Sequence, residues 1–228
     1  MKIAIVGLAG AGKDTFGEML VKHLGSDWEL AKYATPLKEL TRSIFGDDFD
    51  DREVKEVPRS LSDNVGLNYT LEEHLANLVT KFVDNTYMTR AKRFLCLSRL
   101  GKILSDLPNN SISPRQFQQL FGTDVMRSID NNFWVDQLMT KQGNLIITDA
   151  RFENEIDKVD KVFVIINNRL DINDSKYDHV SEQMAKLMTA EAQLNFFTGS
   201  TLVVTNNSDL TALDSKANSW AKLLNTMQ

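Results

Sequence analysis

Short apolar runs alternate with stretches of helical periodicity along most of the chain. Nearly continuous apolar residues at 3–6, 144–148, 162–166 and 202–204 predict strands, and a shorter run at 28–33 predicts another. Apolar runs without polar alternation are typical of parallel strands that are covered on both faces. Because helical segments separate these strands, the pattern predicts an α/β fold with a central parallel sheet and helices on both faces.

Helical periodicity also occurs where no strand is expected. Two amphipathic helices are predicted at 71–85 and 90–105, inside a segment at 61–110 that has the character of a helical insertion. The polar segment 168–181, rich in Asp and Asn, predicts a loop or lid. We therefore expect a single domain over residues 1–228, to which the insertion and the lid segment are additions.

Proline signals predict where two further helices begin. Pro36 stands at a first helical position with Thr35 as its cap, and Ser-Pro at 113–114 gives the same signal. Apolar periodicity carries the second of these helices to about Gly122. The next helix is expected near residue 131, so the pattern places Arg127 in a loop between helices.

The first apolar run leads directly into a glycine-rich turn and then into a helix. Gly7, Gly12 and Lys13 have the spacing of the phosphate-binding loop, or Walker A motif, in the strand-to-helix setting that this motif requires. The backbone N–H groups of such a loop point at phosphate oxygens, and its lysine reaches the outer phosphates. The candidate nucleotide-binding residues are therefore Gly10, Ala11, Gly12, Lys13, Asp14 and Thr15.

The position after Lys13 departs from the usual motif, which has Ser or Thr there to hold Mg²⁺. Here it is Asp14, with Thr15 one place later. A carboxylate beside a polyphosphate is repulsive unless a cation lies between them, so Asp14 is a candidate Mg²⁺ ligand. Alternatively, Asp14 only complements the positive end of the helix, while Thr15 donates to a phosphate.

The strand at 144–148 ends in a second candidate group, since ligands of open α/β sheets collect at the carboxyl ends of the strands. Asp149 can hold Mg²⁺ there, or it can cap a helix that starts at Ala150. Arg151 can turn back over the same edge toward a phosphate, or it can face solvent on that helix. Both alternatives stay open for each residue.

The loop after the last strand contains Asn206 and Asn207 and superficially resembles the N-K-x-D sequence by which GTPases read guanine. The lysine of that motif is missing. We expect this loop to contact an adenine edge, largely through its backbone; the alternative is an ordinary turn before a helix capped by Ser208 or Asp209. Arg169 lies at the start of the lid segment.

Composition and charge narrow the partners and the compartment. The 26 basic and 31 acidic residues leave a net charge of −5, which argues against a nucleic-acid polymer or an anionic membrane as the main partner. No apolar run approaches the roughly 20 residues of a membrane span, and the first strand leaves no room for a secretory peptide, so we expect a cytoplasmic protein. The single cysteine, Cys96, excludes an intrachain disulfide and lies among apolar residues that indicate a buried thiol.

Several segments together resemble one enzyme family. The run 113–127, Phe133-Trp134 and the run 149–155 are similar to bacteriophage deoxynucleoside monophosphate kinases, members of the broader P-loop nucleoside monophosphate kinase group. Further similar segments are 13–15, 34–38, 55–56, 178–182 and 205–208. The resemblance implies that Arg127 and Arg151 grip phosphates, that Gln119 touches the acceptor base, that Lys38 belongs to the substrate site and that Arg169 belongs to the lid. For a phage protein the compartment would be the host cytoplasm.

The function expected from the loop and the resemblance is Mg²⁺-dependent transfer of a phosphoryl group from ATP to a deoxynucleoside 5′-monophosphate. A related kinase acting on dephospho-coenzyme A or phosphomevalonate would have the same ATP half and is the near alternative. A non-catalytic nucleotide-binding switch is an alternative of another class, against which the missing guanine-reading lysine counts. The partners expected are small molecules, and a homodimer formed by the insertion is left open.

Overall fold

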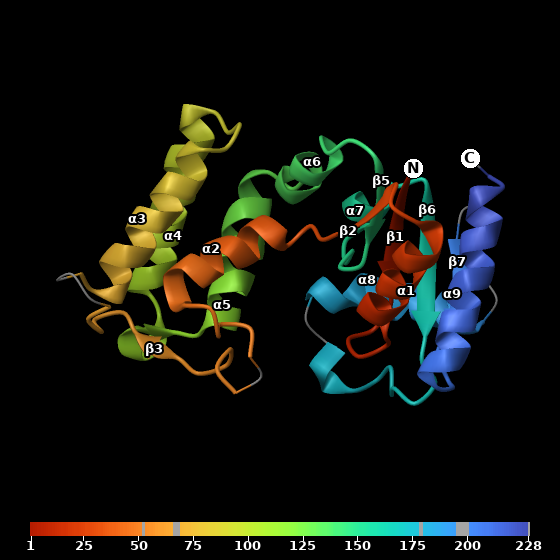
Figure 1. Ribbon diagram of the computed structural model, residues 1–228. Coiled ribbons are helices and arrows are strands. Elements are labelled where there is room, and N and C mark those ends of the chain that lie inside the picture. Colours follow the sequence, from red (N-terminus) through yellow and green to blue (C-terminus); the bar gives the residue numbers. More distant parts are fainter. Residues whose placement is uncertain (52, 66–68, 178–179, 195–200, 228) are drawn as a thin grey trace. The chain divides into compact units, whose positions relative to one another are not determined.

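A computed structural model describes residues 1–51, 53–65, 69–177, 180–194 and 201–227. The chain divides into two compact units, one made of Met1–Tyr33 and Trp134–Gln228 and the other of Ala34–Phe133. Figure 1 shows the elements of both units. The interpretation of residues 1–228 as one domain with an insertion and a lid stays a prediction.

The first unit is built on a parallel sheet that confirms the predicted α/β class. Its strands lie in the order β2-β5-β1-β6-β7, and every pairing is parallel. All five predicted strands are present, with bounds that differ from the expected ones by a residue or two. They are β1 (Lys2–Val6), β2 (Trp28–Ala31), β5 (Asn144–Ile147), β6 (Lys161–Ile166) and β7 (Thr201–Thr205).

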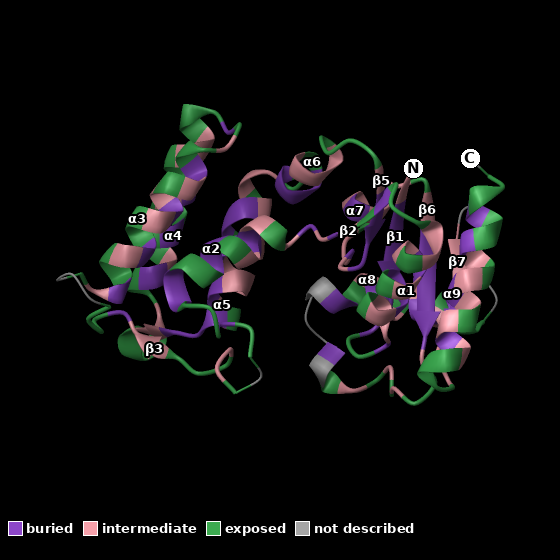
Figure 2. Ribbon diagram, viewed as in Figure 1, coloured by how far each residue is buried: buried purple, intermediate pink, exposed green. Residues whose placement is uncertain are grey.

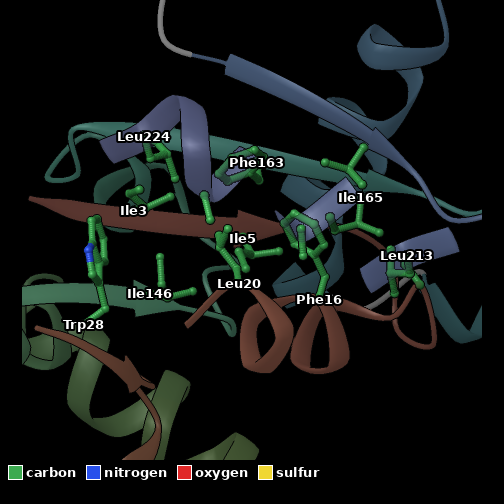
Figure 3. Close-up of a cluster of buried hydrophobic side chains, with 14 residues drawn as sticks. Ile3, Ile5, Phe16, Leu20, Trp28, Ile146, Phe163, Ile165, Leu213 and Leu224 are labelled. Atoms are coloured by element: carbon green, nitrogen blue, oxygen red, sulfur yellow. The ribbon is translucent and has the colours of Figure 1, made fainter. Parts of the chain in front are cut away.

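Helices α1 (Lys13–Leu24) and α9 (Leu210–Asn225) contact each other and cover one face of this sheet. Figure 3 shows the resulting core, in which Phe16 and Leu20 of α1 meet Ile3 and Ile5 of β1 beside Leu213 of α9. The alternate residues of β1 point the other way and are equally buried, so the opposite face is covered as well. At the central strand β1 both faces of the sheet are therefore covered, as its unbroken apolar run predicts.

Three further helices belong wholly or mainly to this unit. They are α6 (Phe133–Met139), α7 (Glu153–Ile156) and α8 (Val180–Gln193), of which α8 packs against β6. The short 3₁₀ turn η3 (Ser175–Tyr177) lies within the lid segment.

The second unit is helical. Its helices are α2 (Thr35–Phe45), α3 (Leu71–Asp84), α4 (Arg90–Ser105), α5 (Pro114–Gln119) and, directly after α5, the π-helix η2 (Leu120–Arg127). Phe117 and Phe121 stack with ring centroids 5.5 Å apart, and Phe45 and Phe82 pack on them from α2 and α3. Figure 2 shows buried stretches along these helices, and Phe45, Phe117 and Phe121 are buried.

A two-stranded ribbon closes the base of the predicted insertion. Strand β3 (Arg59–Ser60) pairs antiparallel with β4 (Ser111–Ile112), and a 3₁₀ turn, η1 (Pro108–Asn110), precedes β4. The two ends of segment 61–110 therefore meet. Within it, α3 and α4 have almost the predicted bounds, because Thr70 and Thr89 cap them with their side chains.

Three details of the helix predictions are wrong. Residue Ala34, and not Thr35, precedes the first turn of α2, although Pro36 lies in that first turn as expected. The helix after β5 starts at Glu153 and not at Ala150. Arg127 is the last residue of a π-helix and does not lie in a loop, because the helix continues past Gly122 with wider turns.

Candidate active site

A glycine-rich loop joins β1 to α1, in the strand-to-helix setting that the motif requires. Gly12 has a φ of +97°, which L side chains rarely adopt, and a Cβ on Gly7 would lie 2.7 Å from the carbonyl oxygen of Ile165. The loop therefore packs closely against the end of β6 at Gly7, and Gly12 allows the positive φ of the turn. The Ala11 N–H donates to the Leu8 carbonyl over 3.0 Å and closes the turn.

Lys13 curls back over this loop. Its Nζ donates to the carbonyl oxygens of Gly7 at 2.8 Å and Leu8 at 3.0 Å. Burial, followed by the positive charge of Arg151, lowers the pKa of Lys13 below its usual value. Three carboxylates act in the opposite direction and raise this pKa; they belong to Glu182, Asp14 and Asp149. The Lys13 ammonium, at the start of α1, is therefore close to one positive side chain and three negative ones.

Asp14 is held by two donors. Thr148 Oγ1 donates to Asp14 Oδ1 over 2.5 Å, and Lys32 Nζ lies 2.8 Å from the same oxygen. Partial burial raises the pKa of Asp14, but the hydrogen bonds from Lys32 and Thr148 and the charge of Lys32 outweigh it, so the pKa lies below its usual value. Lys32 is a residue that sequence analysis missed.

Asp149 and Arg151 follow β5 in a segment without regular secondary structure. The Asp149 carboxylate accepts a hydrogen bond from the Tyr33 N–H over 2.8 Å. The alternative of a cap for a helix that starts at Ala150 is wrong, because α7 starts at Glu153. Arg151 donates through Nη1 to Glu182 Oε1 over 2.6 Å. Glu182 is buried, so this contact anchors the guanidinium beside Lys13.

The ends of β6 and β7 bring three more predicted residues to the same edge of the sheet. Asn206 Nδ2 donates to the Ala11 carbonyl of the loop over 2.9 Å. Arg169 donates to the backbone carbonyl of Asn207 over 2.9 Å. Asp209 caps α9, which confirms the predicted cap but leaves the expected adenine contact untested.

The described part of the lid segment touches the glycine-rich loop. Tyr177 is fully buried, and its hydroxyl donates to the carbonyl oxygen of Ala9 over 3.0 Å. Leu170 lies beside Gly10, where an added Cβ would be 3.9 Å from its Cδ2. Sequence analysis missed Tyr177, since one aromatic residue in a polar segment carries no periodic signal. Asp178 and His179, which belong to a segment of the family resemblance, lie outside the described residues.

The second unit carries the other predicted substrate residues. Lys38 of α2 pairs with Asp50, with 2.5 Å between Nζ and Oδ2. Arg127 donates through Nη1 to the Asn131 carbonyl over 3.4 Å. Gln119 ends α5 and is half-buried, while the Nε2 of its neighbour Gln118 is buried without a hydrogen-bond partner among the described residues.

The remaining observations concern Cys96, metal-binding clusters and membrane spans. Cys96 is buried, and burial raises the pKa of its thiol to about 12, which confirms a structural thiol. Among the described residues, no cluster of three or more His, Cys, Asp or Glu side chains could hold a metal ion by itself. None of the described helices has the length and apolar character of a membrane span.

Comparison with known proteins identifies a family. The family model described as deoxynucleotide monophosphate kinase matches residues 2–217. A search of curated proteins returned no match. The matched range includes the glycine-rich loop, all five strands of the parallel sheet and the whole of the helical unit.

Proposed function

The chain belongs to the deoxynucleotide monophosphate kinase family, and from that premise we propose that it transfers the terminal phosphoryl group of ATP to a deoxynucleoside 5′-monophosphate with the help of Mg²⁺. As a member of this family it is a phosphotransferase with a P-loop kinase fold and small-molecule substrates. The family match does not favour dephospho-coenzyme A, phosphomevalonate or a non-catalytic switch.

The proposal for the donor site rests above all on the cations at the glycine-rich loop. Lys13 and Arg151 are close enough for the charge of Arg151 to lower the pKa of Lys13. Glu182, Asp14 and Asp149 offset part of this positive charge, and a polyphosphate bound at the loop would be a further anion for both cations to contact. Phosphoryl transfer needs this arrangement, because catalysis consists mainly of positioning and of stabilising charge on the transferring group.

The carboxylates at the loop fit a Mg²⁺ ion, which prefers oxygen ligands and commonly takes one or two carboxylates together with substrate phosphates. Asp14 has a side chain that is 57% exposed, and only its Oδ1 has a partner within the described residues. Asp149, at the end of β5, would be the second carboxylate. A bound Mg²⁺ would supply positive charge to the phosphates, while Asp14 and Asp149 would orient it.

For the acceptor we propose Arg127, Lys38 and Gln119, all of the second unit. A guanidinium can hold two phosphate oxygens at once, which suits Arg127 to the monophosphate. Gln119 would present its amide to the base. Arg169 would act from the lid segment. The contact of Asn206 with the loop supports a role for the loop at 206–207 in forming the ATP site, with the adenine contact as part of the proposal.

The deciding experiment measures ADP release from ATP with each acceptor in turn: the four deoxynucleoside monophosphates, dephospho-coenzyme A and phosphomevalonate. Lys13→Ala should lower kcat by at least about a hundredfold at unchanged fold, since it removes a charge that stabilises the transferring group. Lys141→Ala is the matched control, because it removes a lysine whose exposed ion pair with Glu29 lies away from the loop residues. Activity only with the other acceptors, or a Lys13→Ala enzyme with full turnover, would refute the proposal.

Asp14→Asn tests the metal role. It should shift the Mg²⁺ requirement for turnover upward and barely change the melting temperature, because the carboxylate is mainly exposed. An unchanged Mg²⁺ curve would assign Asp14 to the helix end alone. The homodimer stays a prediction, which sedimentation velocity of the purified chain would test.

A further inference from the structure

Lys32 stands beside the glycine-rich loop because of the order of the strands. It directly follows β2, and β2 pairs with β5 so that Ala31 lies opposite Ile147. The next residue on each strand is therefore Lys32 or Thr148, and the Thr148 N–H donates to the Ala31 carbonyl over 3.3 Å. Both side chains end on one oxygen, Asp14 Oδ1, at 2.8 Å and 2.5 Å.

The Lys32 ammonium compensates the negative charge that Asp14 brings to the loop. Most phosphate-binding loops have a neutral hydroxyl residue after the lysine, whereas here Asp14 adds a negative charge at the position where a polyphosphate binds. The Lys32 ammonium adds one positive charge at 2.8 Å from that carboxylate. Asp14 and Lys32 together are therefore as neutral as the serine that they replace.

We propose that Lys32 is a positioning residue for nucleotide binding: it neutralises Asp14, so that a loop with a carboxylate can accept the phosphates of the donor. The inference rests on the proposed function, since it takes the loop to be the phosphate site. Lys32 acts through Asp14, and Thr148 holds the carboxylate in place for that contact.

The test measures ADP binding by calorimetry in EDTA, where no divalent cation can replace the lysine. Lys32→Met should weaken ADP binding by about tenfold, since it leaves the Asp14 charge uncompensated beside the phosphates and solvent screens part of the repulsion. Lys32→Arg keeps the charge and should bind ADP within about threefold of the wild type.

The double variant Asp14→Asn with Lys32→Met separates this role from a structural one. It removes both charges, so ADP binding should return to within about threefold of the wild type, whereas damage to the fold would not be repaired by a second substitution. Asp14→Asn alone should bind ADP in EDTA as tightly as the wild type or more tightly. Lys141→Met breaks the exposed pair with Glu29 of β2, the strand that Lys32 follows, and should leave ADP binding unchanged.

Two results would overturn the inference. One is wild-type ADP affinity in Lys32→Met; the other is a double variant as weak as Lys32→Met, which would mean that Lys32 contacts the phosphates itself. Lys13→Ala in the same assay distinguishes this failure from that of the proposed function. If Lys13→Ala weakens ADP binding and Lys32→Met does not, only the role of Lys32 is lost; if neither does, the loop is not the phosphate site.

Discussion

At Gly17 helix α1 lies close against the sheet, and Gly17→Ala should destabilise the first unit. A Cβ at this position would lie 2.5 Å from Thr148 Cγ2, 3.1 Å from Leu30 Cδ1 and 3.3 Å from Ile5 Cδ1. Thr148 cannot easily move away. It is 1% exposed, its hydroxyl donates to Asp14, and its backbone continues β5.

The magnitude follows from these contacts. Ordinary van der Waals contact begins at 3.4 Å, so Thr148 and α1 would have to separate by about 0.9 Å. Overpacking a well-packed core by a methyl group costs about 1–3 kcal/mol, and the severity of this contact favours the upper part, about 2–3 kcal/mol. Alanine regains about 1 kcal/mol through its helix propensity. The net loss should be about 1–2 kcal/mol, or about 2–8 °C in melting temperature for a chain of this size.

The assay is urea unfolding followed by circular dichroism, together with a thermal melt. Gly101→Ala is the matched control, because Gly101 is also a helical glycine but no heavy atom lies within 4 Å of its added Cβ. That variant should gain up to about 1 kcal/mol, since only the propensity term remains. A Gly17→Ala protein as stable as the wild type, or more stable, would refute the reasoning.

Four further predictions concern single residues. Tyr177→Phe should lower stability by about 0.5–1.5 kcal/mol, the net worth of its hydrogen bond to the loop carbonyl of Ala9, and an unchanged urea midpoint would contradict this. Arg127→Lys should raise the KM for the monophosphate more than that for ATP, because the planar fork is lost; the opposite pattern would move Arg127 to the donor side. Arg169→Ala should lower kcat more than it weakens ATP binding, whereas equal losses would indicate a static binding role. The Cys96 thiol, with its pKa raised to about 12, should react with a thiol reagent at pH 8 only after unfolding in urea, and rapid reaction in buffer would show that it is accessible.

Elements with a strong periodic signal were predictable within a residue or two, and elements without one were not. Helices α3 and α4 combine an amphipathic pattern with threonine caps, and both occur at the expected positions. Strands β3 and β4 are two residues long and show no alternation of apolar and polar residues, so the sequence gives no signal for them. They form because the two ends of segment 61–110 come together in the fold. The π-helix η2 uses the same apolar residues as an α-helix, and the sequence does not distinguish i+4 from i+5 hydrogen bonding.

Gly122 shows why the boundary of that helix was misjudged. In sequence a glycine after an apolar run indicates a C-terminus. In the structure it lies inside η2, and a Cβ on it would be 2.7 Å from Leu37 Cδ2 of α2. The glycine is there for the close approach of two helices. Its role depends on α2, which lies far away in sequence, and a local pattern cannot reveal it.

In the candidate site, too, residues with a local sequence signal could be predicted and a residue placed by distant contacts could not. Lys13 and Asp14 could be found because a loop motif places them by spacing alone, and Asp149 and Arg151 because they end a conspicuous strand. Lys32 could not be found in this way. Its contact with Asp14 requires that β2 lie next to β5 and that Ala31 pair with Ile147. Strand order is a property of the whole sheet, since many orders satisfy the same alternation of strands and helices.

The departure of the loop from its usual form was nevertheless a usable signal. An acidic residue at a phosphate site demands a positive partner, and the sequence offers only a few cations that follow strands of the sheet. Lys32 directly follows β2, so it lies at the edge of the sheet where the strands end. The residues that follow β1, β5, β6 and β7 lie at the same edge. Charge balance would therefore have made Lys32 a candidate for pairing with Asp14 together with Arg151 and Arg169, and the strand order selects Lys32 among them. The same balance makes the pair testable, because a loop that loses both charges should bind ADP almost as tightly as the wild type, whereas a loop that loses only Lys32 should bind it about tenfold more weakly.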